Sequence, residues 1–222
     1  MNRSNLPNND PQTTKPQALL LLGPTASGKT PLGELIERHG LCGTQYVHFD
    51  FGDNLREIVA RDQPDGHVTR EDIDFLHGVL KSGALLEDKD FHIARHILES
   101  FLDRQDVGRH TWTVLNGLPR HAGQARGVDA ILDVQTVIHL QCSAEVVLTR
   151  IRNNTGGDRS RRTDDDAAFV RRKLTVYHER TAPLLDHYAR QGAQIETLEV
   201  TADTTPHQMH DALQSRSRLR TD

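Results

Sequence analysis

The segment with the clearest chemistry runs from Gly23 to Thr30 and reads Gly-Pro-Thr-Ala-Ser-Gly-Lys-Thr. It fits the pattern G-x-x-x-x-G-K-[ST], in which a loop turns successive backbone N–H groups toward phosphate oxygens. Gly23 and Gly28 would allow backbone angles that a side chain forbids. Lys29 would place a charge between the β- and γ-phosphates, and the Thr30 hydroxyl would be a ligand of Mg²⁺. The octet therefore predicts a cradle for a nucleoside triphosphate.

Arginines in separate later segments suggest a second anionic ligand. Phosphoryl transfer depends mainly on positioning and on neutralising charge, so an enzyme with a phosphorylated acceptor must neutralise two polyanions. Arg56 and Arg120 each follow a predicted strand and are candidates for holding the acceptor phosphate. A loop that closes over the reaction would exclude water. The polar loop at 153–162 and its flanks carry the remaining candidates, which are Arg150, Arg152, Arg159, Arg161, Arg162, Arg171, Arg172 and Lys173.

These side chains need a scaffold of alternating strands and helices. The apolar run 18–22 predicts a strand buried on both faces, and an amphipathic helix begins near Lys29. The alternation predicts an α/β fold with a doubly wound parallel sheet, whose ligands bind at the carboxyl ends of the strands. Further strands are predicted at 45–50, 110–115, 136–140 and 195–200. Helices are predicted at 54–61, from Thr69, from Asp88 or Asp90, at 124–132, from Ser143, at 164–192 with a break at Pro183, and from Thr205.

Five segments, in the same order along the chain, resemble the adenylate kinase family of nucleoside monophosphate kinases. Five motifs in family order are far more specific than any one of them, and the resemblance covers nearly all of the chain after residue 17. The segments are Gly-Asp-Asn-Leu-Arg at 52–56, similar to GDxLR; Gly-Ala-Leu-Leu-Glu-Asp at 83–88, similar to GxLVPD; Asn-Gly-Leu-Pro-Arg at 116–120 with Gln124, similar to DGFPR…Q; Arg-Thr-Asp-Asp at 162–165; and the helix at 176–188.

The resemblance implies a P-loop NTPase fold with a five-stranded parallel sheet, a helical monophosphate-binding lobe at 53–104 and a short lid at 152–166. It implies transfer of the γ-phosphate of ATP to a nucleoside monophosphate, with Mg²⁺ as cofactor. The implied ATP-binding residues are Gly23, Ala26, Ser27, Gly28, Lys29, Thr30 and Arg150, with Thr30 on the metal. The implied monophosphate-binding residues are Asp53, Arg56, Leu86, Asn116, Leu118, Arg120 and Gln124. The lid residues are Arg159, Arg162, Asp164, Asp165 and Arg171, and the catalytic group is Lys29, Arg120, Arg162 and Lys173.

Four features depart from the family pattern. The arginine at the start of the family's lid has no clean counterpart, since Arg150 and Arg152 are both candidates and Asn154 stands at one aligned position. Asn116 replaces the carboxylate that helps to organise Mg²⁺ through water, and a neutral amide attracts that water less. Phe51 stands where adenylate-specific members have Thr, which leaves the acceptor base open. Lys173 replaces an arginine and lacks its bidentate fork. No cysteine set is present in the lid, so no structural zinc is expected.

Two alternatives remain open. Asn116 and Lys173 each weaken a charge contact, which would suit a nucleotide-binding protein with little or no turnover. The octet itself looks more like the loop of tRNA dimethylallyltransferases than like the usual kinase loop. In that alternative Asp50 would be the base, although the expected Ser-x-Gln context is missing.

Composition narrows the possible partners and the location. The formal net charge of −4 and an aromatic content of 5% give no basis for nucleic-acid binding by charge or stacking. No apolar run reaches 18 residues, so we expect no membrane association. Cys42 and Cys142 lie far apart and form no ligand motif, which favours a reduced cytoplasmic setting. We expect a monomer that binds a nucleoside triphosphate and a nucleoside monophosphate.

The two ends of the chain are polar. Residues 1–17 are rich in Asn, Pro, Thr and Gln, and they are predicted to be a disordered tail. Residues 215–222 are predicted to be frayed. The kinase domain is expected to span 18–214.

Overall fold

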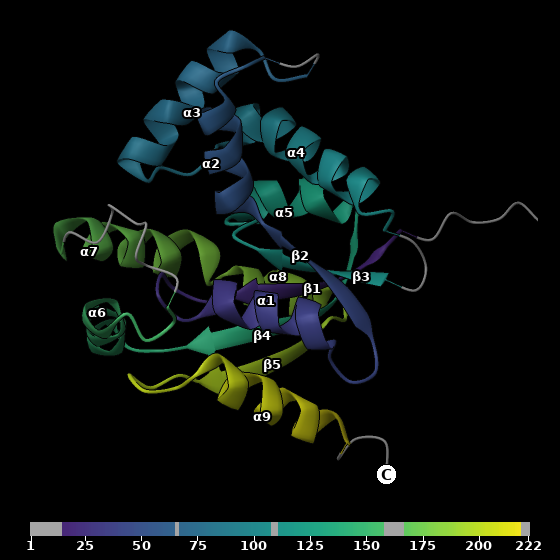
Figure 1. Cartoon of the computed structure of the whole chain (residues 1–222), viewed down its shortest axis with the longest axis vertical. Helices are drawn as coiled ribbons and strands as arrows, with labels where there is room; N and C mark the ends of the chain where they lie inside the picture. Colours follow the sequence, from purple (N-terminus) through teal and green to yellow (C-terminus); the bar gives the residue numbers. More distant parts are fainter. Residues whose placement is uncertain (1–14, 65–66, 108–110, 158–166, 219–222) are drawn as a thin grey trace, which may run out of the picture.

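The computed structural model describes residues 15–64, 67–107, 111–157 and 167–218. Its centre is a five-stranded sheet in which every pairing is parallel, with the strand order β2-β3-β1-β4-β5. The strands are β1 (Gln17–Leu22), β2 (Gln45–Asp50), β3 (Thr111–Asn116), β4 (Asp133–Gln141) and β5 (Gln194–Glu199). The predicted α/β fold is therefore confirmed (Figure 1).

Helices connect the strands and cover the sheet on both faces (Figure 1). In the described ranges they are α1 (Lys29–His39), α2 (Phe51–Arg61), α3 (Arg70–Ser82), the short η1 (Asp88–Asp90), α4 (Phe91–Arg104), α5 (Ala122–Asp129), α6 (Ala144–Asn153), α7 (Ala167–Val176), the π-helical η2 (Tyr177–Thr181), α8 (Leu184–Arg190) and α9 (Pro206–Arg218). None of them combines the length and apolar character that a membrane-spanning helix needs.

Strand β1 lies in the middle of the sheet and divides the core into two clusters. Leu19 and Leu21 pack with α1 and α9, whereas Ala18, Leu20 and Leu22 pack with α4, α5 and α8. Because side chains alternate along a strand, a run of apolar residues fills both clusters at once. This arrangement explains why the run 18–22 is continuous rather than alternating.

Helices α2 and α3 lie beyond the sheet near β2, and α4 returns along the face to which Ala18, Leu20 and Leu22 point (Figure 1). Thr69 starts α3 with the predicted capping box, in which its hydroxyl accepts from the Asp72 N–H and Asp72 accepts from the Thr69 N–H. Gly83 ends α3 in the left-handed conformation, with φ of 67°. These three helices coincide with most of the segment predicted to be the monophosphate lobe, and that role stays a prediction.

Several predicted boundaries differ from the structure, and the ends of β3, β4, β5 and α5 lie one to three residues from the predicted positions. Helix α2 begins at Phe51 rather than at 54, because the Asp50 carboxylate accepts from the Asp53 N–H and caps the helix. The helix expected at 164–192 is broken at Pro183 as predicted, since a turn at 182–183 precedes α8, and the departure from α-helical geometry already begins at Tyr177 with η2. Gln17 belongs to β1, where it pairs with Asp133. Lys15 donates to the Asp129 carbonyl oxygen and Pro16 accepts from the Asp133 N–H, so the predicted disordered tail is wrong for 15–17. Residues 215–218 continue α9, while 1–14 and 219–222 lie outside the described residues.

Candidate active site

The glycine-bounded loop lies between the end of β1 and the start of α1. Ala26 and Gly28 adopt left-handed conformations, with φ of 59° and 100°. At Gly23 the requirement is space, because a Cβ there would lie 2.7 Å from Ser27 Oγ and 2.8 Å from the Leu140 carbonyl oxygen. The expectation that both glycines supply unusual backbone angles is therefore confirmed at Gly28 and wrong at Gly23, where the backbone passes too close to β4.

Lys29 lies over this loop at the first position of α1. Its Nζ donates to the carbonyl oxygens of Gly23 and Pro24, at 2.8 and 2.7 Å. The ammonium is therefore held at the concave side of the loop, beside the positive end of the α1 dipole. A helix N-terminus with a lysine above it favours an anion such as a phosphate.

Two side chains from strand ends and one from the start of α1 meet beside the loop. Thr30 Oγ1 donates to Asp50 Oδ2 at 2.7 Å, and Asn116 Nδ2 donates to the same carboxylate oxygen at 2.7 Å. Asn116 Nδ2 also lies 3.0 Å from Thr30 Oγ1. We call Thr30, Asp50 and Asn116 the polar triad.

The polar triad fits Mg²⁺, which prefers oxygen ligands and keeps part of its water shell. It offers a hydroxyl and a carboxylate, and Mg²⁺ commonly binds proteins through one or two such groups together with substrate phosphates. No group of three His, Cys, Asp or Glu side chains that could hold a metal occurs in the described ranges. The site therefore suits a metal shared with phosphate oxygens.

Arg150, expected to bind ATP, is buried beneath the loop with 1% of its surface exposed. Its Nε donates to the Ala26 carbonyl oxygen at 2.8 Å. Its Nη1 donates to the Thr201 and Thr204 carbonyl oxygens, at 2.9 and 2.8 Å. Arg150 therefore ties the phosphate loop to the segment after β5, and these bonds indicate a positioning residue.

Arg56 and Arg120 lie near the junction between the end of β3 and the start of α2. A Cβ on Gly52 would lie 3.4 Å from Arg56 Nη1, and one on Gly117 would lie 3.7 Å from Arg120 Nη2. Arg56 also pairs with Asp53. The two predicted acceptor arginines therefore come from neighbouring strand ends, next to the polar triad.

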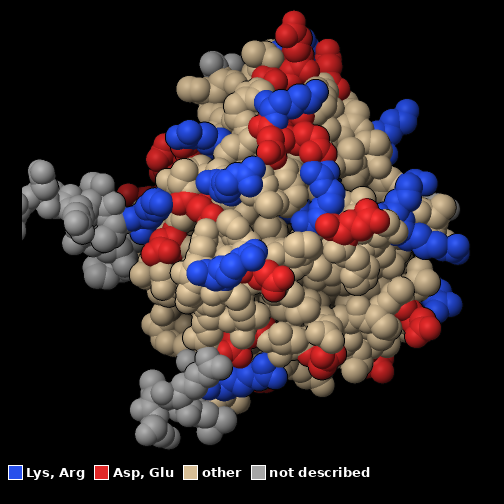
Figure 2. Space-filling model, turned by 180° about the vertical axis from the view of Figure 1, so that it is seen from behind, with Lys and Arg blue, Asp and Glu red and all other residues tan. Residues whose placement is uncertain are grey.

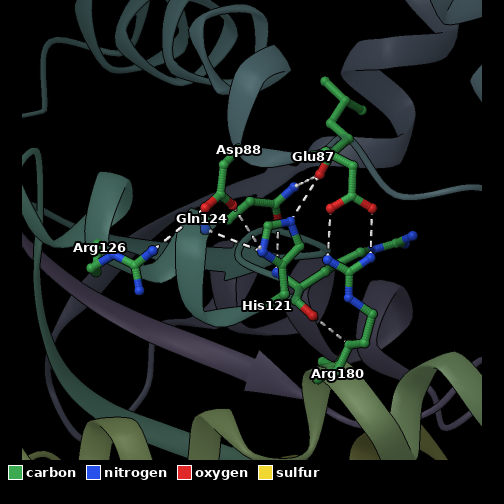
Figure 3. A network of polar contacts seen from close by, with 9 residues as sticks. Glu87, Asp88, His121, Gln124, Arg126 and Arg180 are labelled. Atoms are coloured by element: carbon green, nitrogen blue, oxygen red, sulfur yellow. Dashed lines mark hydrogen bonds and ion pairs between the residues drawn. The ribbon is translucent and has the colours of Figure 1, made fainter.

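Gln124 is buried rather than exposed, and it fixes the segment that carries Arg120. Its Oε1 accepts from the Arg120 N–H at 2.8 Å, and its Nε2 donates to the Leu86 carbonyl oxygen at 2.9 Å. His121 Nε2 lies 2.9 Å from the same oxygen (Figure 3). The side chains of Leu86 and Leu118 are also buried. These groups join the edge of the helical lobe to the Arg120 segment.

Ion pairs continue this network toward the surface (Figure 3). Arg180 on η2 contacts Glu87 with two hydrogen bonds of 2.6 and 2.7 Å, and this contact lowers the pKa of the Glu87 carboxyl. Arg126 lies 3.4 Å from Asp88. The four side chains line a cavity of about 560 Å³ that lies away from the phosphate loop.

The predicted lid can be described only in part. Arg159, Arg162, Asp164 and Asp165 lie outside the described residues. Arg171 is exposed on α7. On the same helix, Lys173 Nζ lies 4.6 Å from the centre of the Phe169 ring. A Cβ on Gly83 would lie 2.4 Å from Phe169 Cζ, so α7 touches the end of α3.

Two features of the site are not evident from the sequence. The sequence suggests a role for Asp50 only in the prenyl-transfer alternative. Its position at the end of a predicted strand nevertheless indicates that it lies near the bound ligand. The pairing of Glu87 with Arg180 joins residues 93 positions apart. An ion pair of this separation leaves no local pattern in the sequence.

Comparisons with known proteins agree with this geometry. The family model "Adenylate kinase" matches residues 21–193. The adenylate kinase of Prochlorococcus marinus (strain MIT 9313) is 32% identical over 189 residues, which cover 82% of this chain and 90% of that protein. The adenylate kinase of Stenotrophomonas maltophilia (strain R551-3) is 32% identical over 180 residues, which cover 78% and 86%.

A solved structure supports the fold. A gluconokinase from Sinorhizobium meliloti 1021 superimposes with a TM-score of 0.51 at 17% identity, covering 93% of this chain and 94% of that one. The comparisons do not favour the prenyl-transfer alternative for the octet. Because the family model and relatives that are 32% identical match most of its length, the chain belongs to the adenylate kinase family.

Proposed function

We propose that this protein transfers the γ-phosphate of ATP to a nucleoside monophosphate, with Mg²⁺ as cofactor. The observation that carries the proposal is the polar triad, because it joins the donor loop to both acceptor segments. Thr30 belongs to the loop, Asp50 precedes the segment of Arg56, and Asn116 precedes the segment of Arg120. Hydrogen bonds of 2.7 Å hold the three segments together, so donor and acceptor phosphates would meet at the triad.

Each proposed role follows from position. Lys29 and the backbone N–H groups of 23–30 hold the β- and γ-phosphates, and Thr30 is a metal ligand. Mg²⁺ supplies charge neutralisation at the phosphate oxygens when it is bound. Arg56 and Arg120 hold the acceptor phosphate. The acceptor side also includes Asp53, with Leu86, Leu118 and Gln124 shaping the wall near the base.

The remaining roles belong to the lid and to the phosphate loop. Lys173 and Arg171 lie on α7 and would cover the transferring group together with Arg159 and Arg162. Asp164 and Asp165 would orient Arg162. Ala26, Ser27 and Gly28 shape the loop, and Arg150 supports it from beneath.

We further propose a cytoplasmic monomer that acts on free nucleotides. On the face shown in Figure 2, Lys and Arg side chains are interspersed with Asp and Glu. Such mixing gives no extended positive field for a nucleic-acid backbone.

The test is a coupled assay with AMP, CMP, GMP, UMP and dTMP as acceptors and with ATP or GTP as donor. We expect turnover with at least one acceptor, and no turnover with any of them would refute the proposal. Lys29→Met should lower the rate by about 10²- to 10³-fold, through loss of charge stabilisation. Arg56→Ala should raise the acceptor KM at least about tenfold, the cost of one charge-assisted hydrogen bond. Arg61→Ala is the matched control, because Arg61 is exposed at the far end of α2.

The alternative of nucleotide binding without turnover rests on Asn116 and Lys173. Single-turnover measurements with excess protein separate the two functions. Tight ATP binding without transfer of phosphate in that experiment would favour the alternative.

A further inference from the structure

Asp50 and Asn116 face each other across neighbouring strands. They are direct partners in the register of β2 and β3, and each is the last residue of its strand. Neighbouring strands lie about 4.8 Å apart, so side chains at these two positions reach the same point. A carboxylate at either position could therefore serve the same neighbour, which here is Thr30.

The hydrogen bonds define which atoms remain for a further ligand. Thr30 Oγ1 donates its proton to Asp50 Oδ2 and accepts from Asn116 Nδ2. A hydroxyl oxygen has two acceptor positions, so one stays for a cation. Asp50 Oδ1 accepts from the Asp53 N–H at 3.1 Å, which fixes the carboxylate plane.

We propose that Asp50 is the carboxylate that organises Mg²⁺ and its water at this site, and that Asn116 holds Asp50 in place. This inference rests on the proposed function. It makes Asp50 a positioning residue and places the negative charge at the end of β2 rather than of β3. Asn116 then supplies the N–H donor that a carboxylate at its position lacks.

A simpler role for Asp50 is to cap α2, and one substitution distinguishes the two roles. Asn caps a helix as well as Asp does, so Asp50→Asn keeps the cap and removes the charge. The exchange Asp50→Asn/Asn116→Asp keeps one carboxylate and one amide in the triad but reverses their strands. Asp62→Asn is the matched control, because Asp62 is an exposed carboxylate at the other end of α2.

The experiment measures binding of Mn²⁺, as a probe for Mg²⁺, to the full-length protein saturated with a non-hydrolysable ATP analogue. Free Mn²⁺ is followed by electron paramagnetic resonance. Asp50→Asn should weaken Mn²⁺ binding about 10- to 100-fold, as loss of a group that orients the metal shell does. The exchange variant should recover most of this loss, and the control should bind like the native protein. With a chelator present to remove the metal, the affinity of Asp50→Asn for the ATP analogue should stay within about twofold of the native value.

Two results would overturn the inference: Mn²⁺ affinity of Asp50→Asn within about twofold of native, or an exchange variant as weak as Asp50→Asn. Urea unfolding checks that each variant is folded. If Asp50→Asn is not folded, Asp50→Ser decides the question by the same criterion, because serine also caps a helix. Failure of the proposed function looks different, since native protein would then bind Mn²⁺ with the analogue yet transfer phosphate from ATP to no acceptor.

Discussion

Replacing Arg150 by Met should lower the free energy of unfolding even when no nucleotide is bound. The substitution keeps an apolar stem in a site that is 1% exposed, and it removes the donors of three hydrogen bonds of 2.8 to 2.9 Å. A hydrogen bond to a charged group contributes about 1.5–3 kcal/mol. Adding the energies of the three hydrogen bonds overestimates the loss, because all three belong to one guanidinium. The Met variant also avoids the cost of burying that charged group. We expect a loss of about 3–5 kcal/mol in the free energy of unfolding.

Urea unfolding followed by circular dichroism measures this loss. With a slope of about 2–3 kcal/mol per molar urea, the midpoint should fall by roughly 1–2 M. Arg152→Met is the control, because Arg152 lies two residues further along α6 and is exposed. An Arg150→Met midpoint close to that of the native protein, combined with weaker ATP binding, would refute the reasoning and show that the guanidinium serves the nucleotide directly.

Two further predictions concern packing and pH. Gly33→Ala should destabilise the protein by about 1–3 kcal/mol, because the new Cβ would lie 2.3 Å from His48 Nε2. Gly78→Ala, in open space on α3, should stabilise it by up to about 1 kcal/mol, and thermal melting compares the two. Burial lowers the pKa of His48 below its ordinary value of 6.5, against the opposing pull of nearby carboxylates. As the pH drops below about 6.5, His48 is protonated in the unfolded chain before it is protonated in the folded protein. The free energy of unfolding should therefore fall in this pH range. His48→Gln should reduce that fall between pH 7.5 and 5.5, and an unchanged pH dependence would contradict the assignment.

Local signals account for much of the fold. The run 18–22, the capping box of Thr69 with Asp72 and the cap at Ser143 each act over a few residues, so the sequence contains all the partners. Strand β2 was predicted with the observed ends for the same reason. Elements of this kind depend on propensity and periodicity, which a single sequence displays.

Contacts between distant residues account for what the sequence does not reveal. Gln124 on a helix face resembles an exposed polar residue until the fold brings it under Leu86. Arg150 resembles other arginines near the lid, and only the position of Thr201 and Thr204 makes it a buried support. The role of the Asp50 carboxylate becomes evident only when the fold places Asn116 beside it on the neighbouring strand. Such pairings depend on topology, which local patterns do not encode.

The contact between Phe169 and Gly83 has a mechanical consequence. The Phe169 ring occupies the space that a Cβ at position 83 would need, so the end of α3 and the start of α7 pack closely because the residue is glycine. Four residues beyond Gly83, Glu87 links the same two parts of the chain through its two hydrogen bonds with Arg180. The lobe and the helices after the lid therefore meet through both contacts, and any side chain at position 83 would have to force the first of them apart.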